Sequence, residues 1–587
     1  MQTQSFDPIL LEIINNHLIS TCQEMAETMM RTSYSPIFHE GRDFSCAVFD
    51  TKTELAAQAE GCPSQLGALP FAVRNCVYES GGVDELHPGD VLGFNDAYLG
   101  NPHLPEFTLI KPAFYKDKHF CGFPAMTAHH MDVGGKTPGG FPSDATDIFS
   151  EGVIVPPTKL WIGGEENVDV IKMILSNTRT PRNTYGDINA QRGALVTAEK
   201  RLYALIDKYG LETFFRYVDL IKDYAQRLMI KEIQTWPDGT YHGEDFVDGD
   251  GLSERIYKIG VDVTVEHSKD NPVTIDFSTT DEQSRGPINC PFGVSASASR
   301  VVMMNLAGPG IPHNHGSMIR PFKFIIPHGT VANVNWPGAL SSGNTETYNI
   351  ICAAVLKAMS KCVPDKVAAA DCSTIGIFSG GDPCGHTEPF VWWDGGGWGG
   401  MLGQDGLSAV VSWAGARAQQ YPVEYIETRY RDIWRVDRYG LVTDSHGDGQ
   451  FRGGLGVEKV YDVVGGEQTV CITLNRHRKG PWGLFGGTDG APSTALIRKK
   501  GDSSFKTAGE LFGAMSSGKF VTNLQAGDSI LIRLPGGGGY GKPTERDRQK
   551  VEWDLMNRYI SAERAVTVYG LAKERAEEIV ENYWYSG

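Results

Sequence analysis

The 587-residue sequence predicts a mixed α/β (α+β) fold that is large and multi-layered, with several short-stranded sheets and a helical hairpin. Three observations predict it. An amphipathic helical stripe opens the chain, short strand-like segments separated by Gly, Pro and Asp occupy about 40–180, and strand and helix patterns alternate after Pro237. At roughly 100 to 200 residues per domain, this length favours three or four domains or one elaborated fold.

The first region, residues 1–185, begins with a helix and continues with short strands. Asp7 can cap the helix and Pro8 suits its first turn. One helical face carries the apolar positions Leu10, Ile14, Leu18, Cys22, Met25 and Met29. We expect this face to pack on the core, and we expect strands in FSCAVFD, DVLGFND, TLIKPAFY and GVIVPPTKL.

The second region, residues 186–236, reads as a helical hairpin. Residues 187–209 and 211–233 are amphipathic, and Gly210 lies between them, so we expect two antiparallel helices. An α/β region follows over 237–410, with GVDVTVEH, VTIDFSTT and FKFIIPHGTVANV as strands, and with SASASRVVMMNLAG and TYNIICAAVLKAMSK as helices. Residues 411–587 predict a β-rich region that ends in helices after Pro543.

Charge and composition exclude several classes of partner and location. Lys plus Arg number 54 against 71 Asp plus Glu, which gives a net charge of −17, and no basic cluster offsets it. We therefore expect no nucleic acid and no membrane as partner, because both demand a basic face. No apolar run approaches the ~20 residues of a membrane span, and we expect a cytoplasmic protein. The eleven cysteines form no CxxC pair, which is typical of reduced core residues.

Glycine is the unusual residue of this composition. The 69 glycines are about 12% of the chain against a usual ~7%, and they predict many tight turns. We also interpret PGGGGYG (535–541) as a turn, because it lacks the GK[ST] ending of a phosphate loop. The segment 390–406 holds seven glycines and three tryptophans and predicts either a loop that lines a site or interface or a packed surface loop.

The strongest chemical signal lies in HEGRDFSCAVFD (39–50), GFNDAYLGNPHLPEF (93–107) and TAHHMDVGG (127–135). Each segment brings imidazole or carboxylate groups beside Gly at a strand-to-loop transition. The nitrogen and oxygen donors that one ion needs are Asp43, His103, Glu106, His129, His130 and Asp132. The alternative is that each side chain hydrogen-bonds its own loop, and no HExxH or CxxC spacing decides between the two.

Other polar residues are candidates for orienting ligands or binding substrate. Asn95 and Asp96 lie in the second of these segments. Asn344 and Glu346 lie in SGNTETYN before a predicted helix, where free amides and the helix dipole favour an anion, although ordinary capping explains them too. No GxSxG or nucleotide-binding motif occurs, so covalent catalysis has no support and we expect no cofactor-binding residues in this chain.

Several motifs in one order resemble the hydantoinase B family, the B-type subunits of hydantoinase/oxoprolinase enzymes. They run from residue 41 to about 547 and read GRDFSCAVFD, FNDAYLGNPHLPEFTLIKPAF, AHHMDVGG followed by TPGGFP, IFSEGVIVPPTKL, NTRTPRNTYGDINAQRGA, RYGLVTDSHGDGQFRGGLGVEKVY, PWGLFGGTDG and LPGGGGYGKPTERD. The resemblance therefore covers nearly the whole chain.

The resemblance implies an enzyme subunit with a metal. Family members work beside an A-type subunit that binds ATP with Mg, and the B-type subunit holds one divalent ion, for which zinc, iron and manganese are all candidates. Carried over by position, the metal ligands are Asp43, His103, Glu106 and His129. This chain has PHLPE where the family usually has THLPD, so Glu106 replaces Asp and the preferred ion can differ. We expect His103, His129 and Asp132 to be catalytic, Asp132 by orienting His129, and we rank His130 lower.

The resemblance leaves three functions open. The leading expectation is ATP-dependent hydrolysis of a cyclic amide (a hydantoin, a lactam or 5-oxoproline), in which metal-bound water attacks a carbonyl that the A-type subunit has activated by phosphorylation. The alternative is a biotin-independent ketone carboxylase of the acetone or acetophenone type. The third is a scaffold that only positions the A-type subunit. We expect a hetero-oligomer such as α2β2, with 390–406 as a candidate contact.

Overall fold

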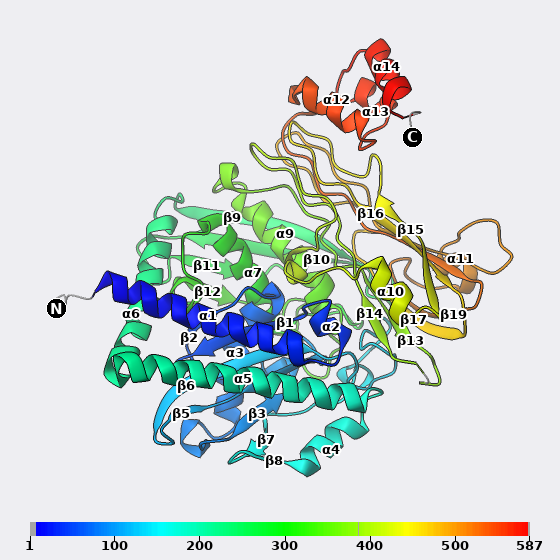
Figure 1. Cartoon of the computed structure of the whole chain (residues 1–587). Coiled ribbons are helices and arrows are strands. Elements are labelled where there is room, and N and C mark those ends of the chain that lie inside the picture. Colours follow the sequence, from blue (N-terminus) through cyan, green and yellow to red (C-terminus); the bar gives the residue numbers. More distant parts are fainter. Residues whose placement is uncertain (1–6, 386, 585–587) are drawn as a thin grey trace.

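The computed structural model describes residues 7–385 and 387–584 and confirms a mixed fold of several small sheets (Figure 1). The largest sheet is antiparallel and has the order β2-β1-β6-β4-β3-β7-β8, with β5 paired to β6. Its strands are β1 (Phe44–Phe49), β2 (Leu55–Gln58), β3 (Val91–Phe94), β4 (Glu106–Ile110), β5 (Ala113–Tyr115), β6 (His119–His129), β7 (Thr158–Ile162) and β8 (Glu165–Glu166). The GVIV half of the predicted strand GVIVPPTKL is irregular, so β7 begins only at Thr158.

Three four-stranded sheets complete the β-structure. The second sheet contains β9 (Gly239–Asp248), β10 (Ile256–Val265), β11 (Val273–Asp276) and β12 (Phe322–Ile325). The third contains β13 (Ile377–Gly381), β14 (Phe390–Trp392), β17 (Glu467–Thr473) and β19 (Lys519–Gln525). The fourth contains β15 (Trp434–Leu441), β16 (Val457–Val463), β18 (Thr494–Arg498) and β20 (Ser529–Arg533). Only the pair β11 and β12 is parallel among the described strands.

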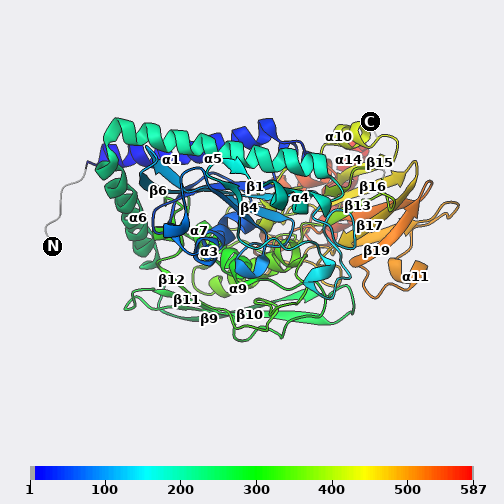
Figure 2. The ribbon, with the colours of Figure 1, turned by 90° about the horizontal axis from the view of Figure 1, so that it is seen from below.

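Helices cover both faces of the largest sheet. Figure 2 shows α1 and α5 on its outer face, the layer of α3, α7 and α9 on its other face, and the second sheet beyond that layer. The helices are α1 (Pro8–Thr32), α2 (Pro36–His39), α3 (Pro63–Glu79), α4 (Val168–Ser176), α5 (Pro181–Tyr209), α6 (Leu211–Ile233), α7 (Phe292–Ala307), α8 (His315–Met318), α9 (Tyr348–Met359), α10 (Val423–Arg429), α11 (Ala508–Phe512), α12 (Arg548–Met556), α13 (Ala562–Thr567) and α14 (Lys573–Tyr583).

The first helix follows the prediction. Asp7 caps α1 by accepting a hydrogen bond from the backbone N–H of Ile9 at 2.8 Å, and Ile14, Leu18 and Met25 on its apolar face are fully buried. The predicted hairpin is different in detail. Its helices meet at Gly210, but α5 packs along α1, and α6 turns away from α5 instead of lying antiparallel to it (Figures 1 and 2). The predicted boundary between 185 and 186 lies inside α5.

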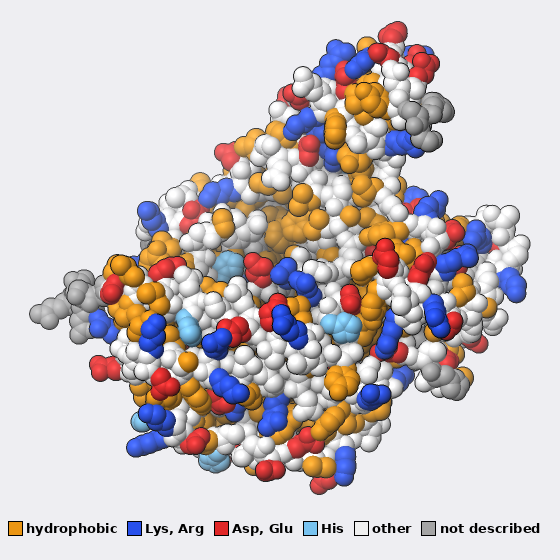
Figure 3. All heavy atoms as spheres, viewed as in Figure 1, with side chains coloured by type: hydrophobic (Ala, Val, Ile, Leu, Met, Phe, Trp, Pro, Cys, Tyr) orange, Lys and Arg blue, Asp and Glu red, His pale blue; other side chains and the backbone are white. Residues whose placement is uncertain are grey.

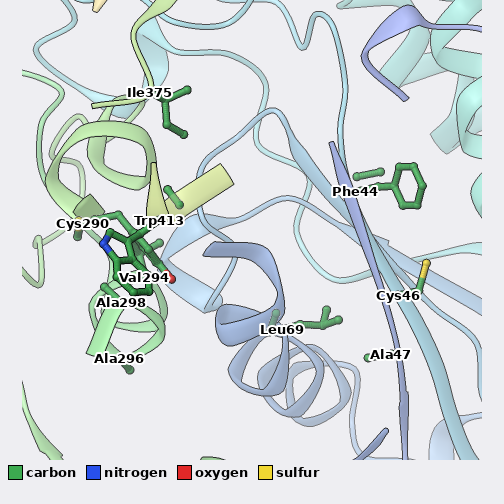
Figure 4. Packing of buried hydrophobic residues seen from close by; sticks show 14 of the residues in the cluster. Phe44, Cys46, Ala47, Leu69, Cys290, Val294, Ala296, Ala298, Ile375 and Trp413 are labelled. Atoms are coloured by element: carbon green, nitrogen blue, oxygen red, sulfur yellow. The ribbon is translucent and has the colours of Figure 1, made fainter. Parts of the chain in front are cut away.

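One of the helices was not predicted from the sequence. The sequence between 40 and 180 suggested only short strands, yet α3 occupies Pro63–Glu79 between the largest sheet and α7. Figure 4 shows Leu69 of α3 facing Ala47 of β1, with Val294, Ala296 and Ala298 of α7 on the opposite side. Gly67 permits this contact, because a Cβ there would lie 2.0 Å from Ser297 Oγ. The start of α3 lies next to the candidate site described below.

Many glycines have the positive φ typical of tight turns, as predicted, but those of four segments have another role. Glycine-rich segments 395–400, 447–456, 483–490 and 535–541 run past one another, joined by backbone hydrogen bonds such as Gly400 N–H to Gly538 O (2.9 Å) and Gly447 N–H to Gly537 O (2.8 Å). A Cβ on Gly397 would lie 2.1 Å from Gly454 O. Among the glycines of these segments, only Gly486 and Gly541 have positive φ. PGGGGYG is therefore a packing segment, and these glycines allow backbones to touch.

These segments form the base of the arm that carries α12–α14 (Figure 1). The arm has its own small apolar core and is joined to the body by buried ion pairs, among them Arg452–Asp554 at 3.0 Å. Two of the three tryptophans of the 390–406 segment, Trp392 and Trp393, are 1% and 3% exposed and pack within this chain, which leaves them no surface for a partner. On the face seen in Figure 3, charges of both signs are scattered and apolar side chains gather in a hollow between the body and the arm.

No described helix is both long and apolar enough to span a membrane. All eleven cysteines are free and all except Cys384 are buried, as expected for reduced core residues.

Candidate metal centre

The four predicted ligands come together at one end of three neighbouring strands. Asp43 precedes β1, Glu106 begins β4, and His129 ends β6, which lies between them in the sheet. Glu106 is the register partner of His129, and the His129 N–H donates to the backbone oxygen of Asp43 at 3.1 Å. Antiparallel pairing thus places the start of β1 and β4 beside the end of β6. His103 lies in the loop just before β4.

His103 is held in one tautomer. Its Nδ1 lies 3.1 Å from the backbone oxygen of Ser341, and because a carbonyl oxygen can only accept, Nδ1 carries the proton. The lone pair is then on Nε2, which is buried, has no hydrogen-bond partner and lies 3.7 Å from Glu106 Oε1. A neutral imidazole with one nitrogen fixed and the other free is the form that binds metals.

His129 offers a second free imidazole. Its ring is 2% exposed and stacks on Phe141 at 5.4 Å between centroids, with the ring of His103 4.9 Å away. Neither ring nitrogen of His129 has a hydrogen-bond partner among the described residues. Buried polar atoms without partners are rare in folded proteins and call for an explanation, such as a role in binding an ion.

The two carboxylates are joined by a residue that the sequence did not single out. Gln65, in the first turn of α3, donates from its Nε2 to Asp43 Oδ1 and to Glu106 Oε2, both at 2.8 Å. Ser45 Oγ donates to the Gln65 oxygen at 2.8 Å and so fixes the orientation of the amide. The thiol of Cys62 lies 3.4 Å from Asp43 Oδ1. These contacts hold the buried Glu106 and the half-buried Asp43 close together.

The electrostatics of the four side chains favour a cation. Burial raises the pKa of Asp43 to about 6, and burial together with the neighbouring Asp43 raises the pKa of Glu106 well above its ordinary range. Burial also lowers the pKa of His103 well below normal and that of His129 to about 3. Among the described residues, neither carboxylate forms an ion pair with Lys or Arg. A divalent ion would satisfy two acids and two neutral imidazoles at once.

The set is more open than a closed coordination shell. The only group of at least three His, Cys, Asp or Glu in the described chain whose ligand atoms all lie within 4.8 Å of one another is Asp50, Glu54 and Asp219. That group surrounds the ammonium of Lys222, with Glu54 at 2.6 Å and Asp219 at 3.0 Å. Arg320 also pairs with Glu54 and Lys52 with Asp219, so three positive charges match the three carboxylates. The predicted set fits a metal by its donor chemistry and its free nitrogens, and binding would draw the side chains closer.

A cavity of about 30 Å³ lies against Asp43, Glu106 and His129, a size that suits an ion or a single water molecule. Asn344 and Thr345 border it from the π-helical turn Gly343–Thr347, which precedes α9. Asn344 Oδ1 is buried and has no hydrogen-bond partner in the described part of the chain. The rest of the wall is largely apolar, with Ile375, Ile377, Val391, Trp393 and Val411. The structure therefore brings Asn344 to the predicted site.

Other predicted residues face elsewhere. His130 Nε2 contacts Gln191 Oε1 at 3.1 Å. Asn95 ties Leu104 to the 153–155 segment, because its Nδ2 donates to Leu104 O at 2.8 Å and its Oδ1 accepts from the Val155 N–H at 2.7 Å. Asp96 caps the short turn Ala97–Leu99. Glu346 accepts from Thr374 Oγ1 at 2.5 Å, and its other oxygen has no partner.

Asp132 does not have the contact that we expected. Its carboxylate receives hydrogen bonds from the Arg179 guanidinium and from the backbone N–H groups of Arg179 and Gly134, at 2.9 to 3.0 Å. Within the described chain, His129 donates no hydrogen bond to Asp132. The acceptor that orients a histidine is the Ser341 carbonyl, and it acts on His103. Asp132 lies instead with His130 against a separate small cavity.

Glu151 supports this acceptor. One carboxylate oxygen of Glu151 receives the backbone N–H groups of Leu340 and Ser341 at 2.6 and 2.8 Å, and burial raises the pKa of Glu151 to about 8. Glu151 thus fixes the loop whose carbonyl holds His103. Nothing local in the sequence signals this role, because Glu151 and Ser341 are 190 positions apart.

Comparison with known proteins places these features in a family. The sequence model described as Hydantoinase B/oxoprolinase matches residues 7–543. The caprolactamase subunit beta of Pseudomonas jessenii is 30% identical, with 96% of each chain covered. The 5-oxoprolinase of Dictyostelium discoideum is 28% identical over 92% of this chain, which spans 41% of that longer protein.

Two solved structures share the fold. The crystal structure of the ATP-dependent caprolactamase from Pseudomonas jessenii superposes with a TM-score of 0.87 at 27% identity, covering 97% of both chains. A nucleotide-free acetone carboxylase superposes with a TM-score of 0.86 at 19% identity, covering 99% of this chain and 84% of the other.

Proposed function

The chain belongs to the hydantoinase B/oxoprolinase family, and from this premise we propose that it is the metal-containing B-type subunit of an ATP-dependent cyclic amide hydrolase. Its substrate would be a hydantoin, a lactam or 5-oxoproline. Its partner would be an A-type subunit that holds ATP and Mg, in a hetero-oligomer such as α2β2. The free thiols fit a reducing compartment, and we propose the cytoplasm.

One observation carries the proposal: two buried imidazoles with free nitrogens lie beside the buried Glu106 and the half-buried Asp43, two carboxylates that no Lys or Arg neutralises in the described chain. Asp43, His103, Glu106 and His129 would hold one divalent ion, with zinc, iron and manganese as candidates. Such an ion lowers the pKa of water and polarises an oxygen atom.

The chain's own residues would prepare the site for an activated amide. Gln65 keeps both carboxylates in place, and the Ser341 carbonyl keeps the His103 lone pair on Nε2. Asn344 Oδ1 and the apolar wall beside Ile377 and Trp393 border the small cavity, which would have to widen to admit a ring; Asn344 Oδ1 could then accept a hydrogen bond from the ring N–H.

The need for ATP follows from amide chemistry. An amide carbon is a poor electrophile, and phosphorylation of its oxygen makes that carbon open to attack by water. Overall, the cyclic amide, ATP and two molecules of water become an open-chain amino acid, ADP and phosphate. We place the phosphorylation on the A-type partner, because no nucleotide motif occurs in this sequence.

The second candidate is a biotin-independent ketone carboxylase. The fold shared with acetone carboxylase favours it, although at 19% identity this likeness concerns the fold alone.

Reconstitution with an A-type subunit tests the proposal. ADP release would be measured with lactams, hydantoins, 5-oxoproline and aryl ketones, with and without bicarbonate. We expect ADP and a ring-opened product from one cyclic amide class, independent of bicarbonate. ADP release that needs both a ketone and bicarbonate would identify a carboxylase, and no stimulation by any substrate would favour a scaffold. This chain by itself should not hydrolyse ATP.

A further inference from the structure

A second cavity lies apart from the predicted metal ligands. It has a volume of about 580 Å³ and is bounded by α1, β2, the start of α3, α7 and the 309–313 loop. Pro63 and Leu66 border it, whereas Cys62 and Ser64 border the small cavity beside Asp43. The first turn of α3 therefore separates the two cavities. Most of the remaining wall is apolar, as with Ile19, Val301 and Ile311.

Arg300 of α7 provides a buried positive charge at this cavity. Its side chain borders the cavity but is 0% exposed, so the guanidinium must turn towards the cavity to meet a ligand. Its Nε donates to the backbone oxygen of Ala296 at 3.3 Å, and its guanidinium lies 5.0 Å from the Phe71 ring. Both terminal nitrogens, Nη1 and Nη2, have no hydrogen-bond partner among the described residues. A buried guanidinium with unused donors is costly unless an anion pairs with it.

No neighbouring group in the described chain supplies that anion. Among the described groups, Tyr348 interacts electrostatically with Arg300, and its hydroxyl stays neutral because burial raises its pKa well above normal. The one carboxylate on the cavity wall, Glu60, lies 3.4 Å from Arg417, and both side chains are solvent-exposed, at 81% and 46%. A bound ligand is therefore the natural partner for the two free nitrogens of Arg300.

The remaining lining limits the charge of such a ligand. His313 stays neutral at pH 7 because burial lowers its pKa, and Arg417 already faces Glu60. One unmatched positive charge remains, and it balances a carboxylate, whereas a phosphate dianion would keep a negative charge in an apolar place. The planar fork of a guanidinium also matches two carboxylate oxygens.

We propose that this cavity binds a monocarboxylate with an apolar body, whose carboxylate pairs with Nη1 and Nη2 of Arg300 and whose body fills the apolar space. This site requires neither the metal centre nor ATP, so its failure and that of the proposed function are separate results.

Calorimetric titration of the full-length protein tests the proposal with hexanoate as the probe. Hexanamide is the neutral match in shape, and inorganic phosphate is the small anion. We expect hexanoate to bind at least tenfold more tightly than hexanamide or phosphate. Equal binding of hexanamide would show that the cation has no role, and equal binding of phosphate would overturn the assignment to a carboxylate. Absence of hexanoate binding at about 10 mM, a concentration on the order of a weak fragment affinity, would overturn the site.

Two variants and a control assign the binding to this cavity. Arg300→Met keeps most of the side-chain volume and should weaken hexanoate binding at least tenfold. Ala416→Trp, at an exposed position on the cavity wall, should block the cavity without changing the core. This variant provides the test if Arg300→Met does not fold. Arg192→Met removes an arginine that stacks on Trp161 elsewhere and should change nothing. Unchanged binding in either cavity variant would contradict the proposal.

Discussion

Gln65 offers a sharp test of the metal centre, because it touches both predicted carboxylate ligands and is not a ligand itself. Replacing it with Leu keeps the approximate volume and removes the amide that donates to Asp43 and Glu106 at 2.8 Å. The two carboxylates would then lose their common hydrogen-bond donor, and their mutual repulsion would no longer be offset. We expect Gln65→Leu to weaken metal binding without removing a ligand.

The structure gives the size of the effect. A hydrogen bond to a charged group contributes about 1.5–3 kcal/mol of stabilisation. The two bonds from Gln65 together therefore stabilise the ionised carboxylates by roughly 3–6 kcal/mol at most. Bound metal compensates for part of this loss, and changes to residues that orient metal ligands typically cost about 10–100-fold in metal affinity. We therefore expect a decrease in affinity of about 10–100-fold.

Metal affinity would be measured by competition with a chelator of known affinity, followed by elemental analysis. The matched control is Gln191→Leu, which removes an equally buried amide that contacts His130 and the backbone oxygen of Phe107. We expect this control to keep its metal. An affinity within twofold of wild type in Gln65→Leu, or an equal loss in both variants, would refute the reasoning.

Three further predictions follow from the same contacts. The variants His103→Gln and His129→Gln should lose the metal and form no product in the reconstituted pair; Gln is chosen over Ala because both rings are buried. The control His130→Gln should keep its metal and its activity. If His103→Gln and His129→Gln each retained the metal, the two histidines would be excluded as ligands. Partial burial raises the pKa of Glu54, but the hydrogen bond from Lys222 and nearby positive charges lower it to about 2, so Glu54 stabilises the fold above its ordinary value of 4.5 and this contribution is lost as pH falls towards 2. The Tm difference between wild type and Glu54→Gln should therefore be largest near pH 7 and shrink below pH 4.5, and a difference that stays constant down to pH 3 would contradict this. Gly539→Ala should lower Tm, because its Cβ would lie 1.9 Å from Asp448 O and overpacking costs about 1–3 kcal/mol or more, while Gly440→Ala, with nothing within 4 Å, should not; equal Tm values would show that the backbone contacts are loose.

Local patterns predicted those elements whose signal lies within the element itself. The stripe from Leu10 to Met29 predicted α1, and Gly210 marked the junction of α5 and α6. Helix α3 was missed because Gly67 and Pro70 interrupt its apolar pattern, and Gln65 was missed with it. The direction of α6 depends on packing against α8, which no local pattern reports.

The candidate site shows the same limit. Ligand chemistry was visible in three segments, because imidazole and carboxylate side chains are conspicuous beside Gly. Their convergence depends on the strand order β1-β6-β4, and the support of His103 by Ser341 and Glu151 depends on contacts between distant loops. Proximity in sequence suggested Asp132 as the group that orients His129, but Arg179 takes its carboxylate instead. PGGGGYG was interpreted wrongly for a related reason, since composition cannot distinguish a turn from a close backbone contact.

Anomalous X-ray diffraction at the absorption edge of the metal found in the purified protein tests the central claim most directly. The account predicts one strong peak per chain, bounded by Asp43, His103, Glu106 and His129, with Gln65 still in contact with both carboxylates. A peak at Asp50, Glu54 and Asp219, or no peak in catalytically active protein, would contradict it.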